Sequence, residues 1–200
     1  MSVSALVLSN GATGAEKQAL ALARACAHSL SLLPIRNPLR RLPTSLQLCA
    51  PASLTGFSPR LPPHPSVAIS CGRATVPASI ALRRHTAGAT LTVHVQTPPC
   101  DPRLFDLIVA PRHDLPEGAV LPPNLIRTEG SLHDITSLTL DQARAAWHLS
   151  MACLPSPRVA LLVGGSISRR PWQRPLGPTL DASLLRGLVE EASQVGRLTF

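Results

Sequence analysis

Short apolar runs that stop abruptly at polar residues constrain the fold of this chain more than any other feature. Residues 67–69 are followed by Ser-Cys-Gly-Arg-Ala-Thr, and residues 107–110 by Pro-Arg-His-Asp. Runs of this kind are typical of strands buried on both faces, as in a parallel α/β sheet. Groups that follow such strands lie at the carboxyl edge, where open α/β sheets bind ligands. We therefore expect one crevice to hold Arg73, Arg112, His113 and Asp114.

The rest of the pattern alternates strands with helices. Further strands are expected at residues 3–8, 30–35, 91–95, 106–110 and 124–128. These alternations predict an α/β fold with a Rossmann-like, mostly parallel sheet.

Threonines mark the expected helix starts. Thr13 and Glu16 have the spacing of a capping box, and apolar residues follow at helical spacing. Thr75 is expected to cap a second helix, and Thr139 a third with Gln142 as its partner. The glycine-containing turn before Thr13 opens a helix, which is an arrangement that favours anions.

Proline divides the chain into parts. Residues 37–66 are expected to form an irregular crossover with one helical turn near residues 45–49. Four arginines make this crossover basic, which suits either a solvated loop or an anionic surface: Arg36, Arg40, Arg41 and Arg60. A boundary at 155–157 separates a Rossmann-like domain, 1–154, from residues 158–200, which are expected to begin a second, incomplete α/β domain.

Charge is unevenly distributed along the 200 residues. The net charge is +8, and residues 1–100 hold nine Lys and Arg against one acid, Glu16. Residues 101–200 hold ten Arg against ten acids. A basic half suits a phosphate or an anionic membrane surface, and the alternative is solvated surface arginine. Nucleic acid is not favoured as a partner, because no basic stripe interleaved with aromatics is present.

Cysteine usage and hydropathy indicate a cytosolic protein. The five cysteines are odd in number and form no CxxC pair, so neither a metal site nor a disulfide framework is expected. No apolar run approaches the ~20 residues of a transmembrane helix, and no cleavable signal peptide is expected. No cofactor is predicted.

A series of short motifs resembles a known family. The motifs run in order from Leu6 to Gly165, and the most specific are Pro-Arg-His-Asp at 111–114 and Gly-x-Leu-His at 130–133. The others are Gly-Ala-Glu-x-Gln at 14–18, Gly-Arg-x-Thr at 72–75, Val-Gln-x-Pro at 95–98 and Gly-Gly at 164–165. The set is similar to that of the mitochondrial fission family of plants, algae and many proteobacteria, known from the plant "elongated mitochondria" protein.

The resemblance implies a fold and a function. The family is similar to glycosyltransferases of the two-Rossmann-domain (GT-B) architecture, so residues 1–154 would be the N-terminal domain of that type. It also implies a cytosolic protein held peripherally on the mitochondrial outer membrane, where it helps to recruit dynamin-related fission proteins. Because the second domain is cut short, any transferase activity would be lost, and the resemblance carries over no catalytic residues.

Two hypotheses follow. The first is an adaptor of the fission machinery, with dynamin-related proteins and an anionic membrane surface as partners. The alternative is a glycosyltransferase-like enzyme that uses a nucleotide-sugar, with His113 or Asp114 as the base. Its ligand-binding candidates are Asn10, Gly11, Gly14, Gly72, Arg73, Gln96, Arg112, Gly130, His133, Gly164 and Gly165.

Structural roles compete with these chemical ones. Arg112 fits a salt bridge, Asp114 an orienting loop residue, and Arg73 an ion pair with Asp106 or Asp114. Cys71 is interpreted as a small buried residue rather than a nucleophile. The enzyme hypothesis predicts that the candidates converge on one open pocket, whereas the adaptor hypothesis allows them to satisfy one another.

Overall fold

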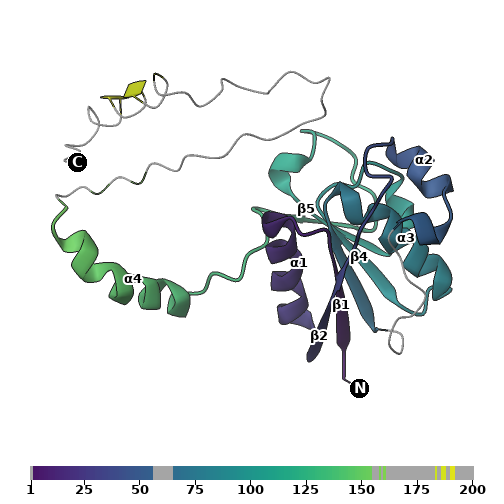
Figure 1. Cartoon of the computed structure of the whole chain (residues 1–200), viewed down its shortest axis with the longest axis horizontal. Helices are drawn as coiled ribbons and strands as arrows, with labels where there is room; N and C mark the ends of the chain where they lie inside the picture. The colour runs from purple at the N-terminus through teal and green to yellow at the C-terminus, as the bar shows by residue number, and fades with distance from the viewer. Residues whose placement is uncertain are drawn as a thin grey trace. The chain divides into compact units, whose positions relative to one another are not determined.

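The computed structural model describes residues 2–55 and 65–154, together with positions 158, 160, 183, 186, 187, 190 and 191. The chain divides into two compact units, 1–134 and 135–200. The first unit contains every strand assigned in the described part of the chain (Figure 1).

The first unit is built on one sheet of six parallel strands in the order β2-β1-β3-β4-β5-β6. The strands are β1 (Ser4–Ser9), β2 (Ser29–Pro34), β3 (Val67–Cys71), β4 (Leu91–Val95), β5 (Leu107–Pro111) and β6 (Leu125–Thr128). The expected strands are present, with ends shifted by one or two residues. The prediction of a Rossmann-like α/β fold is confirmed.

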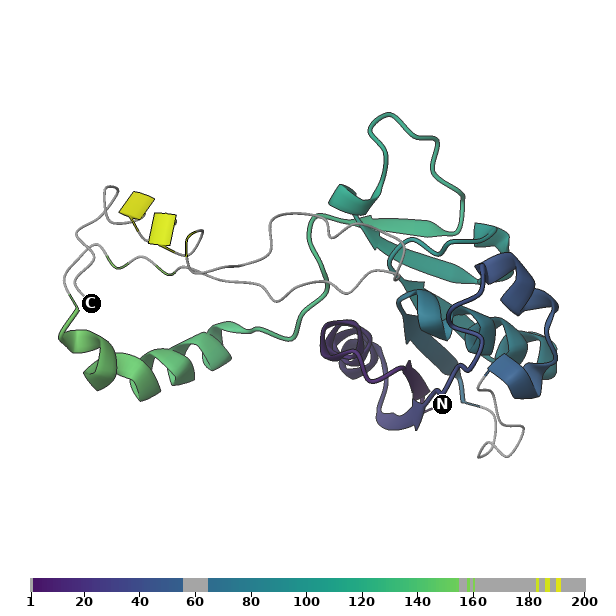
Figure 2. The same ribbon diagram turned by 45° about the horizontal axis from the view of Figure 1, so that its top comes forward.

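Helices cover both faces of this sheet, as Figure 2 shows. The helices are α1 (Thr13–Cys26), α2 (Thr44–Cys49) and α3 (Val76–His85), and short 3-10 turns are η1 (Ala52–Thr55), η2 (Arg73–Thr75), η3 (Pro102–Leu104) and η4 (Arg112–Asp114). The core clusters place α1 on one face and α3 on the other. This two-sided cover explains why the strand sequences are apolar without interruption.

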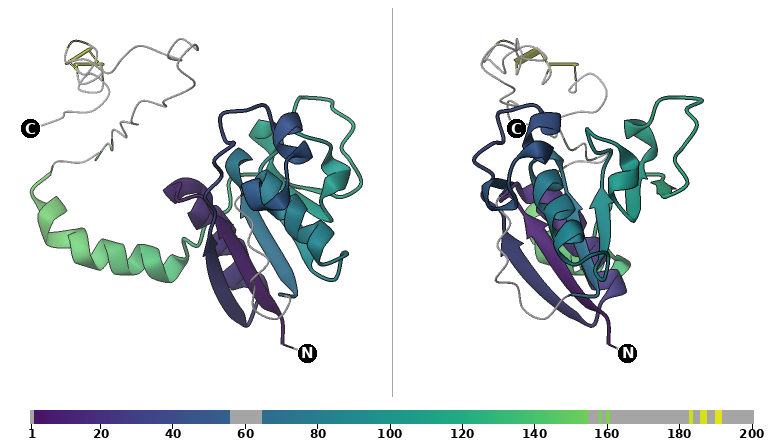
Figure 3. Two further views of the ribbon diagram at one scale, coloured as in Figure 1. Left: turned by 45° about the vertical axis from the view of Figure 1, so that its right-hand side comes forward. Right: turned by 90° about the vertical axis from the view of Figure 1, so that its right-hand side faces the viewer.

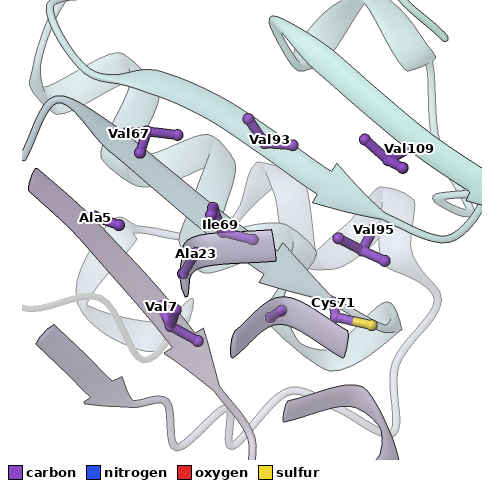
Figure 4. Packing of buried hydrophobic residues seen from close by; sticks show 10 residues of the cluster. Ala5, Val7, Ala23, Val67, Ile69, Cys71, Val93, Val95 and Val109 are labelled. Carbon is purple, nitrogen blue, oxygen red and sulfur yellow. The ribbon is translucent and has the colours of Figure 1, made fainter. Parts of the chain in front are cut away.

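The core under α1 is assembled from alternate residues of neighbouring strands. Val7 is paired with Ile69 across β1 and β3, and both are fully buried. Ala19 and Ala23 of α1 complete this cluster, and their small side chains let the helix backbone approach the sheet closely. Figure 4 shows the valines, Ile69 and Cys71 projecting from the strands into the cluster. The intervening residues, such as Leu6, Leu8 and Ala68, pack toward α3 on the opposite face.

One buried histidine interrupts the apolar core on strand β4. His94 is fully buried, its Nδ1 lies 2.8 Å from Ser70 Oγ, and its ring stacks on Phe105 with centroids 4.8 Å apart. His94 Nε2 has no hydrogen-bond partner within 2–55 and 65–154. Burial lowers the pKa of His94 to about 3, so the ring is neutral in the folded protein.

A carboxylate ties strands β4 and β5 to helix α3. Asp106 Oδ1 accepts hydrogen bonds from Arg83 Nε and Nη2 at 3.0 and 2.8 Å. Asp106 Oδ2 accepts from the backbone N and Oγ1 of Thr92 at 2.8 and 2.7 Å. Burial opposes ionisation of Asp106, but these hydrogen bonds outweigh it, so the pKa of Asp106 lies below its ordinary value.

The crossover between β2 and β3 is irregular, with a short helix near residues 45–49, as predicted. It contains α2 and η1. Its polar residues Asn37, Thr44, Gln47 and Thr55 are buried, although they belong to a connecting segment. The crossover is therefore anchored to the domain by polar contacts.

In the second unit, the structure describes helix α4 (Ser137–Ala152). Its N-cap is Thr136, whose side chain forms a reciprocal capping box with Thr139. The prediction of Thr139 as N-cap with Gln142 was therefore wrong by one helical turn, because Thr136 and Thr139 have the same favourable spacing. The predicted second domain at 158–200 lies almost wholly outside the described residues and stays a prediction.

Replacement of His94 by Leu tests the effect of the buried ring on acid stability. Above pH 6.5 the ring is neutral in both the folded and unfolded states, whereas below it the unfolded chain gains a proton that the folded chain accepts only near pH 3. Wild-type stability should therefore fall on acidification from pH 6.5 toward about 3, with a steepest contribution from His94 of about 1.4 kcal/mol per pH unit.

Urea unfolding across this pH range measures the slope. His94→Leu should flatten the slope, since Ser70 Oγ keeps its 3.3 Å contact with the Val93 carbonyl. The exposed His28 provides the control His28→Leu, which should leave the slope unchanged. Equal slopes of the unfolding free energy against pH in His94→Leu and the wild type would refute the conclusion that His94 is buried and neutral in the folded protein.

Candidate functional site

The carboxyl edge of the sheet gathers the loops that follow the strands. β2 lies on one side of β1 and β3 on the other, so the strand order reverses direction at β1. Crevices at such reversals are the usual ligand sites of open α/β sheets. Figure 3 shows β1 running from the N-terminal end of the sheet toward this edge, where α1 begins.

Two glycine turns flank the reversal point. Gly11 follows β1 with φ of +78°, and Gly72 follows β3 with φ of +82°. Both values lie in the left-handed region, which residues with a Cβ atom rarely adopt. A Cβ atom on Gly72 would lie 3.7 Å from the Cβ atom of Ala15, an ordinary contact, so the dihedral angle rather than crowding requires glycine there.

The turn between β1 and α1 is held by its own side chains. Asn10 Oδ1 accepts a hydrogen bond from Ala12 N at 3.1 Å, and Ser9 Oγ accepts one from Gly11 N at 3.0 Å. Ser9 Oγ also donates to the carboxylate of Glu16. The predicted Thr13–Glu16 capping box was wrong, because α1 starts at Thr13 with Ala12 as its N-cap, and Glu16 reaches back to Ser9 instead.

Gly14 and Gln96 occupy the same edge. Gly14 lies exposed in the first turn of α1. Gln96 follows β4 with φ of +78°, and its backbone N donates to the Val109 carbonyl at 2.8 Å. The side-chain oxygen of Gln96 lies 4.0 Å from the place where a Cβ atom of Gly72 would be. A non-glycine residue in this conformation stores backbone strain, which is typical of functional loops.

Arg73 is used inside the protein. Its Nε donates to Thr44 Oγ1 at 3.2 Å, and its Nη2 donates to the Leu42 carbonyl at 3.0 Å. The alternative partners predicted for it, Asp106 and Asp114, are bonded elsewhere in the described structure. Arg73 therefore fastens the crossover to the loop after β3.

The same crossover is held by a pair of buried amides. Asn37 Nδ2 donates to Gln47 Oε1 at 2.8 Å and to the Ala74 carbonyl at 3.2 Å. Gln47 Nε2 donates to the Leu42 carbonyl at 2.7 Å. Sequence reasoning missed both residues, since a lone Asn and Gln in a proline-rich segment give no periodic pattern.

Arg112, His113 and Asp114 form η4, directly after β5. Arg112 Nη1 lies 3.8 Å from Glu129 Oε2, and His113 Nε2 lies 3.6 Å from Asp114 Oδ1. Arg112 and His113 line an open hollow of about 540 Å³, whose other charged residues are Glu117, Arg127 and Glu129. This hollow therefore combines cations with carboxylates.

The remaining candidates follow β6 or lie outside the described residues. Gly130 follows β6, and its carbonyl accepts a hydrogen bond from Thr128 Oγ1 at 2.8 Å. His133 is exposed and is not among the residues that line the Arg112 hollow. Gly164 and Gly165 lie outside the described residues. The single crevice expected for the two arginines is not formed, because Arg73 turns toward the crossover and Arg112 toward Glu129.

Cys71 is buried at the end of β3. Burial raises the pKa of its thiol to about 12, and the negative charge of Asp114 adds to this effect. The thiol is protonated at neutral pH and does not act as a nucleophile in this state.

The sequence of this chain is similar to sequences of known proteins. The family described as "Mitochondrial fission ELM1" matches residues 13–195. The chain belongs to this family. It is 30% identical over 143 residues to the mitochondrial fission protein ELM1 of Arabidopsis thaliana, an alignment that covers 62% of this chain and 34% of that protein. The chain thus spans about a third of the length of this relative, and no solved structure matches it.

None of the helices in the described part of the chain has the length and apolar character needed to cross a bilayer.

Replacement of Gln47 by Ala tests the amide pair. The change removes the hydrogen bond to the Leu42 carbonyl and takes from the buried Asn37 amide one of its two acceptors, which costs roughly 1–3 kcal/mol. Chemical denaturation measures the free energy of unfolding. Ser45 is exposed on the same helix, so Ser45→Ala is the matched control and should change the free energy of unfolding by less than about 0.5 kcal/mol. Equal losses in both variants would contradict the role of Gln47.

Proposed function

We propose that this protein acts in mitochondrial fission as a non-enzymatic adaptor, held peripherally on the outer membrane, that helps to recruit dynamin-related proteins. The observation that carries the proposal is that the candidate groups are divided between different contacts instead of gathered at one site. Arg73 is bonded to the crossover, Arg112 faces Glu129, and His113 faces Asp114. Catalysis needs groups that converge on a reacting atom, whereas an adaptor needs only a folded surface.

Family membership supports the fission part of the proposal. The basic first half supports the membrane part, since anionic headgroups attract clustered Lys and Arg within a Debye length of the surface. That attraction needs no transmembrane helix. It should weaken as salt is added.

A glycosyltransferase-like activity is the second candidate. The reversal of strand order at β1, flanked by the glycine turns at Gly11 and Gly72, supports it, since nucleotides bind at such positions in other α/β folds. The spread of Arg73 and Arg112 to different contacts weighs against it.

A double variant of the catalytic candidates separates the two functions. Arg112→Gln/His113→Asn should leave recruitment of a dynamin-related GTPase to outer-membrane vesicles within about twofold of wild type, because the adaptor surface does not depend on these side chains. Recruitment is measured by co-sedimentation of the purified proteins with the vesicles. Lack of recruitment by the wild-type chain would refute the adaptor role.

The alternative, glycosyltransferase-like activity is tested with the same purified wild-type and double-variant proteins. Release of nucleoside diphosphate from UDP- and GDP-sugars is followed with time, and the adaptor proposal expects none above buffer. Steady release by the wild type that is lost in the double variant would establish the alternative function instead.

A further inference from the structure

A second hollow opens at the carboxyl edge, beside the reversal of strand order. It has a volume of about 760 Å³, and it lies among the loops that follow β1, β2 and β3. Three arginines and two amides contribute its polar side chains: Arg36, Arg40, Arg41, Asn10 and Asn37. Of the residues that the structure describes, no carboxylate lines it.

Among the described residues, the three arginines have no neutralising partner. In the described part of the chain, none of them forms an ion pair or a side-chain hydrogen bond. Like charges gathered at one concave surface raise the local concentration of anions. The hollow near β5 and β6 differs, since Glu117 and Glu129 offset its arginines.

The segment that carries these arginines is braced from beneath. Asn37 is 8% exposed and Gln47 1% exposed, and their hydrogen bonds fix the turn to the Ala74 carbonyl and to Leu42. Asn37 Oδ1 also accepts a hydrogen bond from Leu39 N at 2.9 Å. The arginines therefore project from a pre-organised turn, which reduces the entropy lost when a ligand binds.

We infer that this hollow, which we call the arginine hollow, binds a phosphate monoester or diphosphate group. A phosphate monoester carries a charge of about −1.5 to −2 at pH 7 and three acceptor oxygens. Planar guanidinium groups bind such oxygens in pairs, with shorter and stronger hydrogen bonds than neutral donors form. Arg73 is a positioning residue for this site, because it holds Leu42 at the end of the same turn.

The phosphate group could belong to a soluble molecule or to a lipid headgroup, and two probes separate these sources. Inorganic pyrophosphate represents the soluble source and is titrated by calorimetry. Phosphatidylcholine vesicles that contain phosphatidic acid represent the lipid source and are tested by flotation. Both are used with the full chain at constant ionic strength, since surface charges are screened over about 8 Å at physiological salt.

Arg40→Gln/Arg41→Gln removes two charges from the arginine hollow. Both side chains are exposed and unpaired, so the fold should be retained, which the thermal unfolding midpoint verifies. The control, Arg24→Gln/Arg84→Gln, removes the same charge from the last turns of α1 and α3, at the opposite edge of the sheet. It also removes the exposed ion pair between Arg24 and Asp134, which is of a kind that contributes little to stability.

The hollow variant should bind the wild type's preferred probe at least about tenfold more weakly, because each guanidinium that is lost removes charge-assisted hydrogen bonds to the phosphate oxygens. The control should stay within about twofold of wild type. Pyrophosphate binding alone identifies a soluble ligand, and vesicle binding that pyrophosphate displaces identifies a headgroup. Absence of wild-type binding to both probes, or an equal loss in the control, overturns the inference. Recruitment of dynamin-related proteins is a separate readout, so the two proposals can fail independently.

Discussion

Parallel pairing of β1 with both β2 and β3 is the constraint on which the rest of this structure depends. Because all six strands run the same way, each connection must cross a face of the sheet and return to its starting edge. Both faces are thereby covered, by α1 and by α3, and the strands need apolar residues at consecutive positions. The same geometry sends every loop that follows a strand to one edge, where Gly11 and Gly72 permit the sharp turns.

The division of arginines between internal and external roles follows from the long crossover. A connection that is rich in proline cannot satisfy its own backbone by forming a long helix, so side chains must bond to it. Arg73 and Gln47 do this for the Leu42 carbonyl. Asn37 of the crossover bonds in turn to the Ala74 carbonyl in η2, which fastens the crossover to the loop after β3. The arginines that remain on the solvent side of the turn have no ion-pair partner in the part of the chain that the structure describes. Arginines near this crossover thus have two different roles: Arg73 bonds to the protein itself, whereas Arg36, Arg40 and Arg41 line a hollow at its surface.

The strands and helices could be predicted from sequence because their signal is local. The run before Cys71 is apolar and short, so β3 was predicted within two residues. The repeat after Thr13 is helical, so the start of α1 was predicted within one residue. Helix caps were predicted less well. Thr75 occupies the N-cap of α3 as expected, yet its hydroxyl donates to the Cys71 and Gly72 carbonyls rather than capping the helix. A hydroxyl has several acceptors within reach at a strand end, and only the folded backbone decides among them.

The candidate site was harder to predict, because convergence depends on side-chain direction. Sequence places Arg73 and Arg112 after parallel strands, and both do lie at the carboxyl edge. Which way each guanidinium turns depends on non-local acceptors, Thr44 for one and Glu129 for the other. The family motifs thus include at least one residue, Arg73, whose side chain holds a loop in this chain. The charge without an ion-pair partner among the described residues lies instead on Arg36, Arg40 and Arg41, outside those motifs. The electrostatics and the motifs therefore indicate binding sites at different parts of the same edge of the sheet.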